Sequence, residues 1–146
     1  MFLGEYKHTL DDKGRIFIPA RFRAREKECF YVTRGLDTCL FVFPLDVWAA
    51  QQERINNMDM MKKDARAFNR LFFSGAAEAA CDKQGRINLP ANLIEYAHLT
   101  KEAMIIGVSD RFEIWSVDIW KEYEEEVAGR FEEIAESLVE KKSGEV

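Results

Sequence analysis

Features that mark secreted, membrane-spanning or metal-binding proteins are missing from this 146-residue sequence. The first residues contain no long apolar segment, and no uncharged apolar run approaches the length of a membrane span. The three cysteines, Cys29, Cys39 and Cys81, are too few and too widely spaced for a disulfide framework or a zinc motif. We therefore expect a cytoplasmic protein with buried thiols, without a membrane segment and without a metal.

Residues that carry out catalysis are also scarce. The two histidines, His8 and His98, have no second ligand at helical spacing, and no glycine-rich phosphate loop occurs. Asp11 and Asp12 are neighbouring carboxylates, but the basic residues that follow them stabilise the charged form, which suits turn capping better than acid–base catalysis. We expect neither an enzyme nor a bound cofactor.

The net charge of −5 argues against nucleic-acid binding, but this charge is unevenly distributed along the chain. Residues 121–146 contain nine Glu against four Lys and Arg, so residues 1–120 are neutral. Within residues 1–25, six basic residues outnumber three acidic ones. A local basic surface is therefore compatible with an acidic protein.

A repeat at an offset of 71 residues organises the chain: residues 11–20 (DDKGRIFIPA) recur as residues 82–91 (DKQGRINLPA). After one inserted residue, residues 35–48 match residues 107–120. Each copy has the pattern β-β-α-β-β-α, so we expect an α+β fold with one repeat in residues 1–70 and the other in residues 71–146. Such short strands cannot bury both faces in so small a unit, which predicts that the copies interlock within the chain or between subunits.

Glycine turns open the repeated segments. Gly14 and Gly85 stand where a tight turn needs a positive φ, and Asp11 and Asp82 can hold such turns through side-chain to backbone hydrogen bonds. After each turn we expect a short strand, and Pro-Ala then begins a short helix.

Two long amphipathic helices are predicted. The first runs roughly over residues 45–72, interrupted near Asn56-Asn57, and the last carries an apolar stripe from Trp120 to Leu138 with glutamates between its members. Both stripes need a partner surface. We expect them to pack within and between subunits, which favours a homo-oligomer over a monomer.

Each turn pairs an aspartate with an arginine four residues later, Asp11 with Arg15 and Asp82 with Arg86. Alone, such a pair is typical of a surface salt bridge worth less than about 1 kcal/mol. Its duplication favours binding, because a carboxylate-held guanidinium is suited to grip a phosphate or guanine O6 and N7. We expect more phosphate contact at the first turn than at the second, because the first has several basic neighbours and the second has Lys83. The basic neighbours of the first turn are Lys13, Arg21, Arg23 and Arg25.

The segments Leu10-Asp11-x-Lys13-Gly14-Arg15-x-x-x-Pro19, 73–78 (FSGAAE), 82–87 (DKQGRI) and 111–115 (RFEIW) resemble the MraZ family over about residues 1–130. The resemblance implies a double swapped-hairpin, AbrB-like fold and ring-shaped oligomers that bind DNA through an Asp-x-x-x-Arg motif in each half. It further implies a nucleoid-associated repressor that binds direct repeats upstream of its own operon, the division and cell-wall gene cluster.

Our leading hypothesis is therefore a sequence-specific DNA-binding repressor. Arg15 and Arg86 make the main contacts, Asp11 and Asp82 orient them, and the lysines add charge. A second hypothesis is an antitoxin-like protein-interaction module whose acidic C-terminal helix occupies a basic target. An enzyme that grips a small anion is the weakest, because no acid–base or nucleophilic group lies near the arginines in the sequence.

Overall fold

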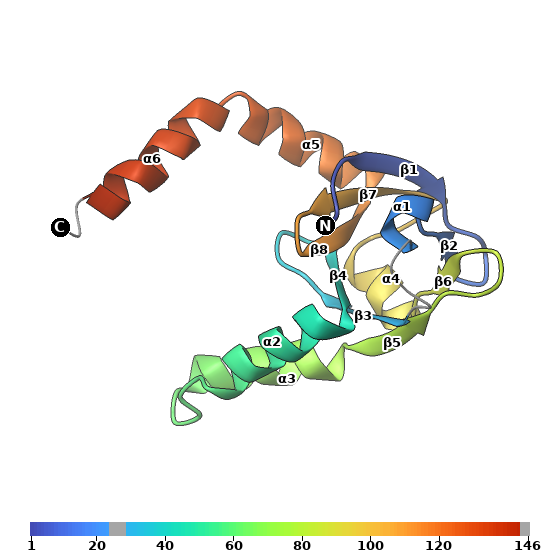
Figure 1. Ribbon diagram of the computed structural model, residues 1–146, viewed down its shortest axis with the longest axis horizontal. Coiled ribbons are helices and arrows are strands. Elements are labelled where there is room, and N and C mark those ends of the chain that lie inside the picture. The colour runs from blue at the N-terminus through green and yellow to red at the C-terminus, as the bar shows by residue number, and fades with distance from the viewer. Residues whose placement is uncertain (24–28, 144–146) are drawn as a thin grey trace.

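The computed structural model describes residues 1–23 and 29–143, with side chains described up to residue 139. Strands and helices alternate as the repeat predicts (Figure 1). The first repeat contains β1 (Glu5–Thr9), β2 (Arg15–Phe17), α1 (Ala20–Arg23), β3 (Cys29–Arg34), β4 (Leu40–Pro44), α2 (Leu45–Asn56) and α3 (Lys63–Ser74). The second contains β5 (Ala77–Ala80), β6 (Arg86–Asn88), α4 (Ala91–Tyr96), β7 (Glu102–Val108), β8 (Arg111–Ser116), α5 (Val117–Ala128) and α6 (Phe131–Ser143).

Strands of the two repeats pair with each other within one chain, which confirms that the copies interlock. A six-stranded antiparallel sheet has the order β1-β7-β8-β4-β3-β5, so the first strand of each repeat pairs with a strand of the other repeat. The second strands of the repeats, β2 and β6, form a separate two-stranded ribbon. Neither repeat could keep this hydrogen bonding alone, so the chain folds around both copies together.

The main core lies between this ribbon and the large sheet. Ile16 and Ile87 face each other across β2 and β6, and both are fully buried. They join Phe30, Phe112 and other apolar residues in one cluster drawn from both repeats. Because side chains alternate along a strand, burial of these isoleucines turns their neighbours on β2 and β6 outward.

The first long helical region is interrupted where we predicted. Helix α2 ends at Asn56, α3 begins at Lys63, and the two form a hairpin that projects from the sheet (Figure 1). Trp48 fixes the base of this hairpin, because its ring stacks on Phe72 at 5.6 Å and on Tyr31 at 5.2 Å between centroids. The hairpin therefore has its own small apolar cluster, distinct from the main core.

The prediction of one continuous C-terminal helix is wrong. Helix α5 ends at Ala128 with Gly129 as its cap, and α6 begins at Phe131 in a new direction. Glycine has a low helix propensity, which makes it a natural break point. The apolar stripe is divided accordingly: Trp120 and Tyr123 pack on Trp115, whereas Phe131 and Leu138 are exposed on α6.

The cysteines differ in burial. Cys39 is completely buried, as expected, whereas Cys29 and Cys81 are only half-buried, so the prediction of buried thiols holds fully for one of the three. In the described ranges, no three His, Cys, Asp or Glu side chains gather closely enough to hold a metal ion. No helix in the same ranges combines the length and apolarity needed to cross a bilayer.

Candidate nucleic-acid interface

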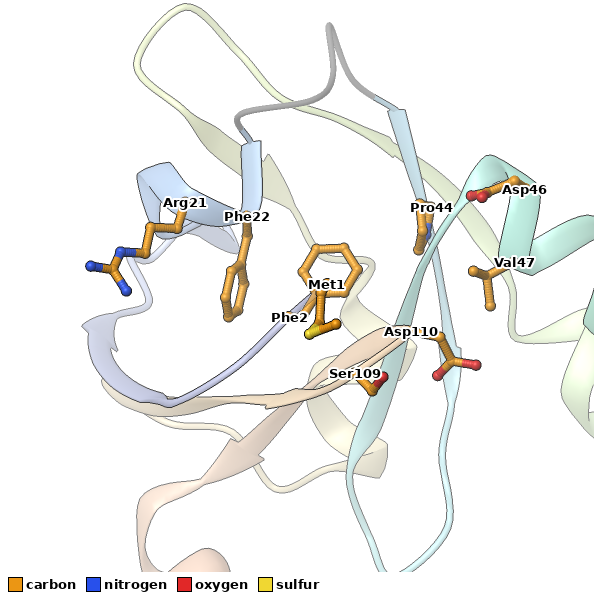
Figure 2. Close-up of a pocket in the computed structure, with 9 residues that line it drawn as sticks. All are labelled: Met1, Phe2, Arg21, Phe22, Pro44, Asp46, Val47, Ser109 and Asp110. Atoms are coloured by element: carbon orange, nitrogen blue, oxygen red, sulfur yellow. The ribbon is translucent and has the colours of Figure 1, made fainter.

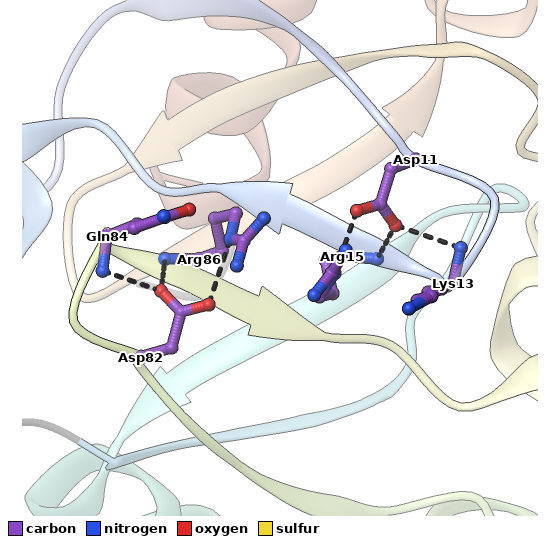
Figure 3. A network of polar contacts seen from close by, with 6 residues as sticks. All are labelled: Asp11, Lys13, Arg15, Asp82, Gln84 and Arg86. Carbon is purple, nitrogen blue, oxygen red and sulfur yellow. Dashed lines mark hydrogen bonds and ion pairs between the residues drawn. The ribbon is translucent and has the colours of Figure 1, made fainter.

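The first Asp-x-x-x-Arg turn is held by its aspartate in the predicted way (Figure 3). One carboxylate oxygen of Asp11 accepts hydrogen bonds from the backbone amides of Lys13 and Arg15, at 3.0 and 2.8 Å. The other oxygen accepts from Nε of Arg15 at 2.8 Å. Gly14 has φ +82°, which confirms the predicted need for glycine at this position.

The second turn repeats this geometry. Asp82 accepts hydrogen bonds from the backbone amides of Gln84 and Arg86, both at 2.9 Å, and from Nε of Arg86 at 2.9 Å. Gly85 also has φ +82°. The matching turns show that both aspartates orient an arginine and cap a turn at the same time.

These hydrogen bonds keep both carboxylates charged. The backbone amide of Arg15 is the largest influence that lowers the pKa of Asp11, and the amide of Arg86 does the same for Asp82. Each arginine uses Nε to bind its aspartate, and its two terminal nitrogens meet no acceptor within residues 1–23 and 29–139. Both guanidinium groups are thus oriented, with donors left over for a ligand.

Pairing of β2 with β6 brings the two arginines to one surface. The antiparallel register places Arg15 opposite Asn88 and Phe17 opposite Arg86, on either side of the buried isoleucines. These four residues make up the outward side of the ribbon, which we call the ribbon face. Figure 3 shows both arginines on its adjacent strands.

Each turn is also bound to the other repeat. The amide of Ile18 donates to the carbonyl of Gly85 at 2.9 Å, and the amide of Leu89 donates to the carbonyl of Gly14 at 2.8 Å.

A family model described as "MraZ protein, putative antitoxin-like" matches the chain twice, over residues 1–71 and 72–142, with one of these turns in each match. The chain belongs to the MraZ family. The resemblance inferred from separated segments is thereby confirmed.

The other predicted site residues of this MraZ-family chain lie at different distances from the ribbon face. Lys13 and Lys83 are exposed within the two turns and add positive charge beside the arginines. A hollow of about 440 Å³ adjoins the first turn, lined by Lys13 and Gly14 from one repeat and by Asn88 and Ile94 from the other. The first turn is therefore open on the side toward α4.

Arg23 corrects one prediction, because it flanks the second turn and not the first. Its Nε donates to the carbonyl of Ile18 at 2.8 Å, and a Cβ placed on Gly85 would lie 2.5 Å from its Cζ. The reason is the antiparallel ribbon: the chain leaving β2 reaches the turn that precedes β6. Ile94 holds the equivalent position beside Gly14.

Arg21 lies elsewhere. It lines a cavity of about 550 Å³ together with residues of the N-terminus, β4, α2 and the β7–β8 turn (Figure 2): Met1, Phe2, Phe22, Pro44, Asp46, Val47, Ser109 and Asp110. No residue of either Asp-x-x-x-Arg turn lines this cavity, so the structure does not bring Arg21 together with those turns. Arg25, also predicted beside the first turn, lies outside the described residues.

Two residues of the ribbon face, Phe17 and Asn88, were not predicted from the sequence. Both are exposed although they lie in short strands next to buried isoleucines. The signal was present: the 71-residue offset aligns Phe17 with Asn88, so an aromatic and an amide occupy equivalent positions in the MraZ repeats. Only the pairing of β2 with β6 shows that they lie beside the arginines.

Proposed function

We propose that the chain is a sequence-specific DNA-binding transcriptional regulator that acts in the cytoplasm, in association with the nucleoid. The observation that carries this proposal is the pair of aspartate-held arginines on the ribbon face, each with unused terminal donors. As the resemblance to MraZ implies, it represses its own operon, the division and cell-wall gene cluster, by binding upstream direct repeats. In this proposal the ribbon face binds DNA and does not catalyse a reaction.

A two-stranded ribbon is a shape that the major groove of DNA can accept. The major groove is about 12 Å wide and admits a two-stranded β-ribbon, and a guanidinium can form two hydrogen bonds to guanine O6 and N7. In our proposal Arg15 and Arg86 make these contacts, while Lys13 and Lys83 neutralise phosphates at the two turns. Each neutralised phosphate releases counterions, so binding weakens as the salt concentration rises.

We also propose that copies of the chain assemble head to tail into a ring. A groove of about 320 Å³ lies between β4 and the α2–α3 hairpin, lined by apolar residues and by Arg34, Arg54 and Arg111. No carboxylate belongs to its described lining, although Arg111 is bound by Glu113. Arg34 and Arg54 therefore leave a positive rim around an apolar floor.

Helix α6 has the complementary surface. Phe131, Leu138 and Val139 are 74, 65 and 66 % exposed, and Glu132, Glu133 and Glu136 lie on the same helix. A second copy's α6 fits this groove in both polarity and charge. Such a contact joins different surfaces of successive copies and forms a ring when the rotation closes. A ring multiplies the number of ribbon faces and so raises the effective concentration of each on repeated DNA sites.

Exposed α6 also supports a second candidate function, an antitoxin-like protein-interaction module with a basic target. Removal of residues 130–146 leaves Trp120 and Tyr123 packed on Trp115, so the body of the protein keeps its core. If the truncated chain loses a basic protein partner but still binds specific DNA, the interaction role belongs to α6. Loss of specific DNA binding together with the ring would assign α6 to self-assembly.

The proposed DNA-binding function is tested by fluorescence anisotropy with a duplex of the chain's own upstream region against a scrambled duplex, over a salt series. Arg15→Ala and Arg86→Ala should each weaken specific binding strongly, and Arg15→Lys should restore only part of it because lysine cannot form the two-pronged contact. Arg70→Ala, an exposed arginine on α3, is the matched control. Equal affinity of the wild-type protein for both duplexes, or wild-type binding by both alanine variants, would contradict the proposal.

A further inference from the structure

The ribbon face has an internal pseudo-twofold arrangement that two residues break. Arg15 and Arg86 are equivalent in the two repeats. Each lies opposite a residue two positions after the other arginine: Arg15 is opposite Asn88, and Arg86 is opposite Phe17. Identical residues at those positions would make the face look the same from both repeats. Instead, Phe17 accompanies Arg86 and Asn88 accompanies Arg15.

The side-chain amide of Asn88 lies beside the first turn. It is exposed, and its side chain makes no hydrogen bond within the described part of the chain. Its Oδ1 lies 3.2 Å from the position that a Cβ on Gly14 would take, at the edge of the open hollow. An asparagine amide can accept a hydrogen bond from adenine N6 and donate one to adenine N7, a two-bond contact comparable to that of arginine, which donates to guanine O6 and N7.

Phe17 offers a different chemistry at the second arginine. Phe17 is 43 % exposed, and Cζ of Arg86 lies 5.8 Å from its ring centroid. This contact helps to hold the guanidinium, whose side chain is 19 % exposed against 34 % for Arg15. A phenyl ring cannot replace a hydrogen-bonding side chain, but its edge can contact the methyl group of thymine.

We infer that Asn88 and Phe17 read bases beside the two arginines and thereby give the ribbon face a direction on DNA. Arg15 with Asn88 selects a guanine next to an adenine, because side chains opposite each other on paired strands lie about 5 Å apart and their ends can reach adjacent bases, which rise by about 3.4 Å per step. Arg86 with Phe17 selects a guanine next to a thymine. This inference rests on the proposed DNA-binding function and adds that the site bound by one chain is not palindromic.

The test is selection of binding sites from randomised duplexes by the purified full-length protein and its variants. Asn88→Ala should lower the preference for one adenine about tenfold, and Phe17→Ala the preference for one thymine by a smaller factor. Both residues are uncharged, so affinity for scrambled DNA and the salt dependence should stay as in the wild type. Phe17→Asn places an asparagine beside both arginines and should make the selected site more symmetric. Asn92→Ala, an exposed asparagine on α4, is the control.

The outcomes separate this inference from the proposed function. If Arg15→Ala and Arg86→Ala abolish selection while the Asn88 and Phe17 variants select the wild-type site, the DNA-binding function stands and the inference is overturned. A wild-type protein that selects no sequence overturns both. A change in sedimenting mass for Phe17→Asn, with unaltered base preference, would assign the phenyl ring to contact between subunits and also overturn its reading role.

Discussion

Arg23 of the first repeat covers Gly85 of the second, so that a Cβ on the glycine would lie 2.5 Å from its Cζ. The guanidinium also donates to the carbonyl of Ile18, the residue whose own amide binds Gly85. Each turn therefore depends on the other repeat for its neighbours. The equivalent residue in the second repeat, Ile94, leaves the first turn without this charge.

This placement makes Arg23 a contributor to DNA binding at the second turn. Arg23→Ile introduces the residue found at the equivalent position of the second repeat. It should lower the affinity for DNA about equally for all sequences and reduce the slope of log affinity against log salt concentration by about one. Salt titration by anisotropy measures this slope. Arg21→Ala, on the separate cavity, is the control and should change the slope less. Equal slopes for wild type and Arg23→Ile would remove Arg23 from the phosphate contacts.

The two turn glycines should respond unequally to alanine. Both have φ +82°, so each substitution costs about 1–2 kcal/mol for the left-handed conformation alone. At Gly14 the new Cβ would also lie 2.9 Å from the carbonyl oxygen of Leu89, part of the backbone, whereas at Gly85 it meets the movable end of Arg23. Gly14→Ala should therefore be the more destabilising in urea unfolding. The reverse order would show that Arg23 is fixed more firmly than the backbone around Leu89.

The turn aspartates should be insensitive to pH in the physiological range. Hydrogen bonds from Arg15 and Arg86 lower the pKa of Asp11 and Asp82 in the folded protein. A lowered carboxyl pKa stabilises the fold above the unfolded-state value of about 3.9, and this stabilisation is lost as the pH falls through the folded value. NMR titration of the two carboxyl carbons and the arginine Nε–H groups should show constant signals from pH 8 to 5 and release only below about pH 4. Release near pH 6 would contradict the turn geometry.

Cysteine reactivity should separate Cys39 from Cys29. Burial raises the pKa of the Cys39 thiol far above its usual range, and the group is completely enclosed. Iodoacetamide at pH 8 should label half-buried Cys29 first and Cys39 only after unfolding, as peptide mass spectrometry can show. Rapid labelling of Cys39 in the folded protein would mean that the β3–β4 connection opens readily.

Charge on the apolar side of α6 should dissociate the proposed ring. Phe131→Glu and Leu138→Glu replace exposed apolar side chains that would lie on the apolar floor of a second copy's groove, where burial of a carboxylate is costly. Sedimentation velocity should show a smaller particle with unchanged helix content. Leu3→Glu, also exposed but far from α6 in sequence, is the control. An unchanged mass for both α6 variants would place the subunit contacts elsewhere.

Much of this protein could be predicted from local sequence, because the decisive features involve residues that are close in the chain. An aspartate, a glycine and an arginine within five positions are enough to define each turn, and both turns have the expected hydrogen bonds. The repeat predicted the order of strands and helices, and the pattern near Asn56 predicted the break before α3. The break at Gly129 was not predicted, because the apolar stripe continues through it.

Other features depended on contacts between distant residues. The sequence by itself determined two arginines, each held by its own aspartate in a glycine turn. Only the tertiary structure decided that β2 pairs with β6, which puts both arginines on one face, adds Phe17 and Asn88 to it, and sends Arg23 to the turn of the other repeat. The physical reason is range: a turn is stabilised by hydrogen bonds over four residues, whereas the pairing of strands 71 residues apart is selected by the burial of Ile16 and Ile87 in a core that both repeats build together.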